Sequence, residues 1–118
     1  MNEIIGTTIR LTKGDTFVRT ISLRRLVDNE EYTPVEGDVI HFALKRNVLN
    51  VSMTGYIGDE PLIVKEIPID TMVLRINAED TKSLAVGDYV YDIEVTFADG
   101  DVDTPINCGI FTLLPEVY

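Results

Sequence analysis

The chain has 118 residues, and its 10 Lys and Arg stand against 20 Asp and Glu, which gives a formal net charge of −10 at pH 7. This charge repels phosphate backbones and anionic bilayers, so we expect neither nucleic acid nor a membrane as partner. The length fits one domain over residues 1–118, with a core large enough to fold without disulfides. Residues 1–14 lack the basic and apolar regions of a secretory signal, so we expect synthesis in a reducing cytoplasm.

Three segments in the first half of the chain read as strands. Residues 7–12 place Ile9 and Leu11 on one side, and residues 16–23 alternate in the same way, with Arg19 interrupting the apolar side. The clearest alternation of the three covers residues 39–45, with one face formed by Ile40, Phe42 and Leu44. The polar segments 27–37 and 47–60 are expected as surface or binding loops.

The second half of the chain predicts four more strands. Residues 61–69 and 72–76 read as a hairpin, and residues 89–97 alternate long enough to predict a central strand. Asp99-Gly100 predicts a tight turn into a last strand over residues 101–114. The apolar positions change parity within that strand, which predicts a β-bulge at Gly109.

Residues 77–84 give the one helical signal in this pattern. Asn77 is suited to cap the first amides, and two acidic residues follow in the first turn. The Leu84-Ala-Val-Gly87-Asp-Tyr89 segment then predicts a tyrosine corner, in which the Tyr89 hydroxyl bonds back to upstream backbone while its ring packs in the core. Leu84, Gly87, Tyr89 and Gly109 are therefore the expected structural residues.

Together these elements predict an all-β fold: an antiparallel immunoglobulin-like β-sandwich of about seven strands with one short helical turn. The helical turn before residues 89–97 resembles the one that leads into strand F of immunoglobulin-like domains. The paired cysteines and core tryptophan of antibody domains are missing, because the chain has one Cys and no Trp.

A wider resemblance covers nearly the whole chain. It is carried by an ordered set of short motifs: Lys13-Gly-Asp-Thr-Phe17, Gly37-Asp-Val-Ile-His-Phe42, Leu62-Ile-Val-Lys-Glu-Ile67, Asn77-Ala-Glu-Asp-Thr81, Val86-Gly-Asp-Tyr-Val-Tyr-Asp-Ile93, Asp103-Thr-Pro-Ile106 and Gly109-Ile-Phe-Thr112. The set resembles small β-sandwich proteins of bacteriophage and prophage tail regions, akin to the N-terminal domain of baseplate upper proteins. This resemblance implies a non-enzymatic structural module, made in a bacterial cytoplasm and attached to other proteins of the virion tail.

Residues that could carry chemistry are few. His41 is the only histidine, so no second imidazole is present for a metal site, and Cys108 has no basic neighbour in sequence to activate its thiol. Asp99, Asp101 and Asp103 alternate around the turn, and the interpretation we prefer is a solvated acidic hairpin rather than a Ca²⁺ site. An acid–base pair between Asp92 or Glu94 and Asp101 or Asp103 is the weaker alternative. We therefore expect no catalytic residues, no metal and no cofactor.

Two functions from different classes follow. The first is a structural adaptor of a phage or prophage tail or baseplate that binds other virion proteins or copies of itself, with weak self-association. Its expected contact residues are Ile9 and Leu11 on an open edge strand and Val90 on the wetter sheet face. The alternative is a carbohydrate-binding module that uses Tyr32 and Tyr56 as stacking platforms.

Overall fold

The computed structural model describes residues 3–5, 7–25, 28–46 and 61–116. Their chain order is β1 (Glu3–Ile5), β2 (Thr8–Thr12), β3 (Phe17–Thr20), β4 (Val39–Arg46), β5 (Ile63–Ile67), β6 (Val73–Ile76), α1 (Ala78–Thr81), β7 (Gly87–Thr96) and β8 (Val102–Leu114). The predicted all-β class is confirmed. Among the described residues no helix is long and apolar enough to cross a membrane, and α1 has only four residues.

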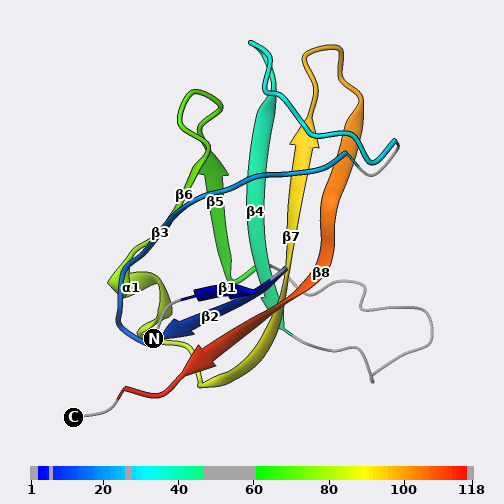
Figure 1. The fold of residues 1–118 in the computed structure, drawn as a ribbon. Helices are drawn as coiled ribbons and strands as arrows, with labels where there is room; N and C mark the ends of the chain where they lie inside the picture. Colours follow the sequence, from blue (N-terminus) through cyan, green and yellow to red (C-terminus); the bar gives the residue numbers. More distant parts are fainter. Residues whose placement is uncertain (1–2, 6, 26–27, 47–60, 117–118) are drawn as a thin grey trace.

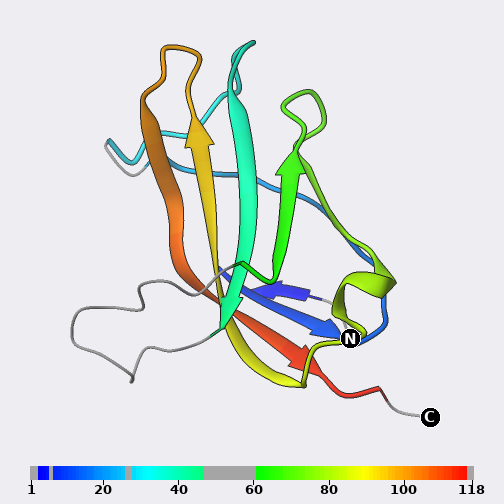
Figure 2. The ribbon, with the colours of Figure 1, turned by 180° about the vertical axis from the view of Figure 1, so that it is seen from behind.

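Six of the strands form a curled sheet with the order β1-β2-β8-β7-β4-β5. The remaining two, β3 and β6, form a separate antiparallel pair. Figure 1 shows that β1, β2 and the end of β8 fold across the lower part of the sheet. It also shows β3 on the left beside β6, and the segment after β3 crossing in front of β4 and β7. The core lies between these layers. Seen from behind, no other described element covers β8, β7, β4 and β5 (Figure 2).

The alternation read from the sequence correctly predicts which side of most strands is buried. Along β2, β4 and the second half of β8, every second side chain is buried, and the same alternation holds from Tyr91 to Val95 of β7. The buried residues include Ile40, Phe42 and Leu44 from β4, Tyr91, Ile93 and Val95 from β7, and Phe17, Leu74 and Ile76 from the opposing pair. Their burial supplies the main hydrophobic stabilisation of the fold.

Two predictions about strand pairing are wrong. The sheet is mixed, because β2 runs parallel to β8, with Ile9 opposite Phe111 and Leu11 opposite Leu113. The predicted hairpin over residues 61–76 does not form, because β5 pairs with β4 whereas β6 pairs with β3. Alternation within a strand reports which face is buried and carries no information about the neighbouring strand.

The corner prediction at the start of β7 is confirmed. The Tyr89 hydroxyl donates to the Ala85 carbonyl at 2.6 Å, and the half-buried Tyr89 and Leu84 side chains pack against the core. Upstream, Asp80 accepts the backbone N–H of Asn77 at 2.8 Å, and its carboxylate also pairs with Lys65 of β5 at 2.8 Å. Helix α1 is one turn long, shorter than the predicted segment, and Gly87 has a φ of +140° at the bend into β7.

The irregularity predicted in the last strand lies where the parity changes. One extra residue of β8 separates the partners of Tyr91 and Ile93, which are Gly109 and Ile106. The residue with positive φ is Cys108, at +57°, and its N–H donates to Asp92 at 2.7 Å. Gly109 is needed for space, since a Cβ there would lie 2.7 Å from the Tyr91 ring. The hydroxyl of the same tyrosine donates to the Thr7 carbonyl.

The three predicted contact residues are not exposed. Strand β2 has neighbours on both sides, and Ile9 and Leu11 point into the core with at most 1% of their surface exposed. Val90 lies on the face opposite the main core, yet it is only 1% exposed, with Lys45 and Ile110 as its cross-strand neighbours. The prediction of an open apolar surface at these residues is therefore wrong.

Candidate functional site

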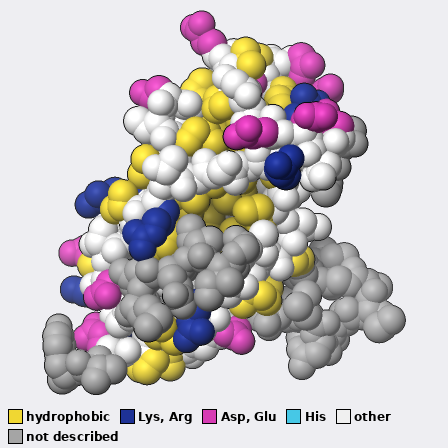
Figure 3. Space-filling model, in the orientation of Figure 1, with side chains coloured by type: hydrophobic (Ala, Val, Ile, Leu, Met, Phe, Trp, Pro, Cys, Tyr) yellow, Lys and Arg dark blue, Asp and Glu magenta, His cyan; other side chains and the backbone are white. Residues whose placement is uncertain are grey.

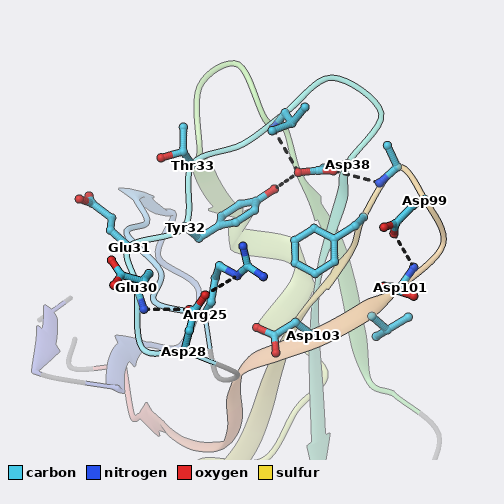
Figure 4. A pocket seen from close by; sticks show the side chains of 14 residues that line it. Arg25, Asp28, Glu30, Glu31, Tyr32, Thr33, Asp38, Asp99, Asp101 and Asp103 are labelled. Atoms are coloured by element: carbon cyan, nitrogen blue, oxygen red, sulfur yellow. Dashed lines mark hydrogen bonds and ion pairs between the residues drawn. The ribbon is translucent and has the colours of Figure 1, made fainter.

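A cavity of about 810 Å³ opens at the end of the molecule where β7 turns into β8. One wall comes from the segment between β3 and β4, and the other comes from the turn and the first residues of β8 (Figure 4). Its lining residues are Arg25, Asp28, Glu30, Glu31, Tyr32, Thr33, Val35, Asp38, Phe97, Ala98, Asp99, Asp101, Val102 and Asp103. This cavity is the candidate functional site of the described residues.

The first wall is formed by residues 23–25 and 28–32, which pair with each other as in a short hairpin. The N–H groups of Tyr32 and Arg25 donate to the carbonyls of Leu23 and Glu30 at 2.9 and 2.8 Å, and Asn29 takes a φ of +58° at the tip. The Asp28 side chain accepts the Glu30 N–H at 3.0 Å, which is the local turn chemistry of aspartate. The backbone therefore holds the carboxylates of this wall at the surface.

Asp38 joins the two walls. Its Oδ2 accepts the Tyr32 hydroxyl at 2.6 Å and the Val35 N–H at 3.1 Å, while Oδ1 accepts the Ala98 N–H at 3.1 Å. Asp38 is only 7% exposed, and these donors satisfy both oxygens of the buried carboxylate. This arrangement, which we call the Asp38 clamp, fixes the segment before β4 against the β7–β8 turn.

Aromatic contacts extend the clamp to the floor of the cavity. The Tyr32 ring meets Phe97 edge-on, with ring centroids 6.1 Å apart. The Arg25 guanidinium lies over the same Phe97 ring at 5.5 Å, a cation–π geometry. Arg25 Nε also lies 3.7 Å from Asp28, which is an ion pair too long to be a hydrogen bond.

Protonation of the clamp follows from its hydrogen bonds. Desolvation by burial raises the pKa of Asp38, but the hydrogen bonds from Tyr32, Val35 and Ala98 outweigh it and hold this pKa below its ordinary value. Burial, followed by the bond to Asp38 and its charge, raises the pKa of Tyr32 well above the usual value. At neutral pH the pair is therefore a phenol donating to a carboxylate.

The cavity is strongly acidic. Of the residues that line it, seven are Asp or Glu, and Arg25 is the one Lys or Arg.

The turn between β7 and β8 forms as the sequence predicts. Asp99 accepts the Asp101 N–H at 2.9 Å, and the turn closes with Gly100 N–H donating to the Phe97 carbonyl at 2.9 Å. The predicted turn is confirmed, with positive φ at Gly100 only. No group of three metal-ligating side chains occurs among the described residues.

The structure separates the residues of the acid–base alternative. Asp101 and Asp103 line the cavity, whereas Asp92 accepts the Cys108 N–H and lies 3.9 Å from Lys45 on the outer sheet face. His41 of β4 is exposed and lies between its cross-strand neighbours, Glu94 of β7 and Glu66 of β5. The geometry does not bring these groups together for proton transfer.

The carbohydrate alternative loses one of its two platforms. Tyr32 is only 6% exposed, and its hydroxyl and ring are occupied by Asp38 and Phe97. A sugar cannot stack on a ring that is already packed in the core. Tyr56 lies outside the described residues.

Sequence reasoning missed the two residues that organise the cavity, Asp38 and Arg25. A local signal for Asp38 exists, because a Gly-Asp pair directly before a strong strand pattern places the carboxylate beside backbone amides. Nothing local indicates that Ala98, 60 positions away, supplies one of those amides. No family model, no curated protein and no solved structure matches this chain.

Proposed function

We propose that this chain is a non-enzymatic structural adaptor of a phage or prophage tail or baseplate, with an immunoglobulin-like β-sandwich fold. In this proposal it binds other virion proteins or copies of itself, and it uses no cofactor. The ordered sequence motifs that resemble small tail proteins are the reason for naming this class of assembly. The other support comes from the strand arrangement and from strand edges without neighbours.

The strand arrangement favours the immunoglobulin-like topology. In such domains strands B and E share one sheet, and strands C, F and G share the other. Here β3 and β6 form one sheet, while β4, β7 and β8 are adjacent in the other, and the tyrosine corner precedes β7 as it precedes strand F. The parallel β2–β8 pair is a departure from an antiparallel sandwich.

Unpaired strand edges are the observation that carries the adaptor role. Among the described residues, β3 pairs only with β6, and the first half of β8 pairs only with β7, because β2 reaches no further than Phe111–Leu114. Monomeric proteins usually cover or guard such edges, and protein partners bind them by adding a strand. The described residues offer these edges and no assembled catalytic group.

The adaptor role is tested with the products of the genes beside this one. Each product is co-expressed with the tagged chain, and complexes are detected by size-exclusion chromatography. We expect a co-eluting complex with at least one tail or baseplate protein. Neighbouring genes without virion functions, or no complex with any product, would overturn the proposal.

A matched pair of variants locates the contact. Val18 on β3 and Val64 on β5 are both exposed, at 40% and 55%. We expect Val18→Asp to abolish the complex and Val64→Asp to leave it intact, because only the first places a charge beside the β3 edge. Equal effects of the two variants would remove the β3 edge from the proposal.

A further inference from the structure

Two of the strand edges that have no neighbour among the described residues, the outer edge of β3 and the first half of β8, are complementary to each other. We infer that this chain assembles head to tail, with the β3 edge of one copy pairing with the first half of β8 of the next copy. The inference deepens the proposed adaptor function by naming a second copy of this chain as a partner. It rests on the backbone pattern of each edge and on their opposite charges.

The free side of β3 follows from one hydrogen bond. The Ile21 N–H donates to the Met72 carbonyl at 2.7 Å, in line with the β3–β6 register. Antiparallel strands alternate between residues whose polar groups face the partner and residues whose groups face away. The backbone N–H and C=O groups of Phe17, Arg19 and Ile21 therefore point toward β6. Those of Val18 and Thr20 point away from it.

The Arg19 side chain marks this edge as a place where a strand is missing. Its guanidinium lies 5.4 Å from the Phe17 ring and donates to the outward Val18 carbonyl at 3.0 Å. That bond stands where a neighbouring strand would supply an N–H. A carboxylate on an incoming strand would draw the guanidinium outward and release the carbonyl for ladder pairing.

The free side of β8 follows in the same way. The Phe97 N–H donates to the Asp101 carbonyl at 2.8 Å, and Val95 stands opposite Asp103. The alternation then directs the N–H and C=O groups of Val102 away from β7. Val102 is 57% exposed and lies on the cavity, and no strand of the described residues pairs with this side of the first half of β8.

The two edges carry opposite charge. The strand β3 carries one charged residue, Arg19, in a chain of net charge −10. Residues 97–103, which lead into β8, hold three Asp and no Lys or Arg. In the view of Figure 3, acidic side chains are frequent at the upper end, where the β7–β8 turn lies, together with basic side chains at the upper right, and further basic side chains lie on the left.

The sequences of the edges match when they are aligned antiparallel. Val18-Arg19-Thr20 then faces Thr104-Asp103-Val102, with Arg19 opposite Asp103 and each Val opposite a Thr. Opposite charges in directly facing positions stabilise a strand pair, whereas a symmetric β3–β3 pair centred on Arg19 would place like charges together. The charges thus favour the second copy's β8 over its β3.

The position of the edges makes the assembly open-ended. β3 and the first half of β8 lie on opposite sides of the molecule in both ribbon views (Figures 1 and 2). One copy can therefore bind a neighbour at each edge, which builds a chain or a ring. A contact this short buries far less than a standard interface, so we expect weak association that needs high protein concentration.

The test uses only this chain, so its result is independent of complexes with other virion proteins. Light scattering with size-exclusion chromatography is run at concentrations up to about 1 mM. We expect the average mass of the wild type to rise above the monomer mass of 13.2 kDa. Arg19→Glu, which reverses the β3 edge, and Asp103→Arg, which reverses the β8 edge, should each remain monomeric.

Mixing the two variants distinguishes head-to-tail pairing from other contacts. Arg19→Glu retains a native β8 edge, and Asp103→Arg retains a native β3 edge, so an equal mixture should associate again. The two substituted positions also carry opposite charges, so association in the mixture is not limited to pairs of molecules. Asp101→Arg, one diagonal position from Arg19 in this register, repeats the test if Asp103→Arg does not fold. Arg46→Glu and Glu94→Arg, exposed sites that carry the same charge changes, are the controls and should associate like the wild type.

Three results would overturn the inference. The first is a wild type that stays monomeric at every concentration. The second is association that persists in Arg19→Glu or Asp103→Arg, or that is lost equally in the control variants. The third is a mixture of the two variants that stays monomeric, because a symmetric contact cannot be restored by mixing two differently damaged copies.

Discussion

Two tyrosines anchor this fold in different ways. Tyr89 donates to a carbonyl four residues upstream and keeps its hydroxyl at the surface. Tyr32 is buried and donates to Asp38, whose other oxygen binds the N–H of Ala98 from the far end of β7. The first anchor shapes a local bend, while the second joins segments that are distant in sequence.

The two tyrosine anchors therefore stabilise different parts of the fold. A hydrogen bond at the surface takes the place of a hydrogen bond to water in the unfolded chain, so its net contribution to stability is modest. A buried polar group that loses its partner, in contrast, costs its full desolvation energy. The corner therefore adjusts the entry into β7, and the Asp38 clamp holds the cavity walls together. The predictions below compare distant anchors with the local one, from the largest expected effect to the smallest.

Removing the clamp carboxylate should cost the most. Asp38→Ala leaves the Tyr32 hydroxyl and the amides of Val35 and Ala98 without their acceptor in a buried site. We expect a loss of about 3–5 kcal/mol in the free energy of unfolding, measured by urea denaturation. Asp38→Asn, which keeps the shape and one acceptor oxygen, should lose less. Equal stability of Asp38→Ala and wild type would contradict the clamp.

Filling the space beside Tyr91 is the next largest change. A Cβ at Gly109 would lie 2.7 Å from the Tyr91 ring and 3.0 Å from Ile106, so the ring must shift. We expect Gly109→Ala to destabilise the fold by about 1–3 kcal/mol in the same denaturation assay. Asn107→Ala, at an exposed position of β8, is the control and should change little. A neutral Gly109→Ala would show that the bulge accommodates a side chain.

The two tyrosine hydroxyls can be compared directly. Tyr89→Phe should lose about 0.5–1.5 kcal/mol, the net contribution of an ordinary hydrogen bond. Tyr32→Phe should lose more, about 1.5–3 kcal/mol, because its acceptor is a buried carboxylate. Urea midpoints of both variants against wild type provide the measurement. The reverse order would mean that the corner, and not the clamp, is the stronger anchor.

Acid should weaken the clamp and leave the corner unchanged. The pKa of Asp38 is lowered in the folded state, so its contribution is present above the ordinary aspartate pKa and is lost as pH falls through the lower folded value. At pH values below about 4, we expect the urea midpoint of the wild type to decrease more steeply with falling pH than the urea midpoint of Asp38→Asn. Tyr89→Phe should follow the wild-type slope. Parallel slopes for wild type and Asp38→Asn would show that Asp38 does not contribute to the acid response.

The sequence was informative wherever neighbouring residues decide the structure. Alternation identified the buried faces of β4, β6 and β7, because side chains point to opposite faces of a strand. Short-range chemistry located the turn at Gly100, the cap at Asn77 and the tyrosine corner. Each of these depends on contacts within about five residues.

Pairing and burial across the molecule were decided by the tertiary structure. The strand β2 reads as an edge in the sequence, yet it lies between β1 and β8, and its Ile9 and Leu11 side chains point into the core. Adjacent β5 and β6 belong to different sheets, and the acidic cavity depends on Asp38 meeting Ala98. Alternation specifies the face a residue occupies, but only packing of the whole chain selects its strand neighbours, because many pairings satisfy the same local pattern.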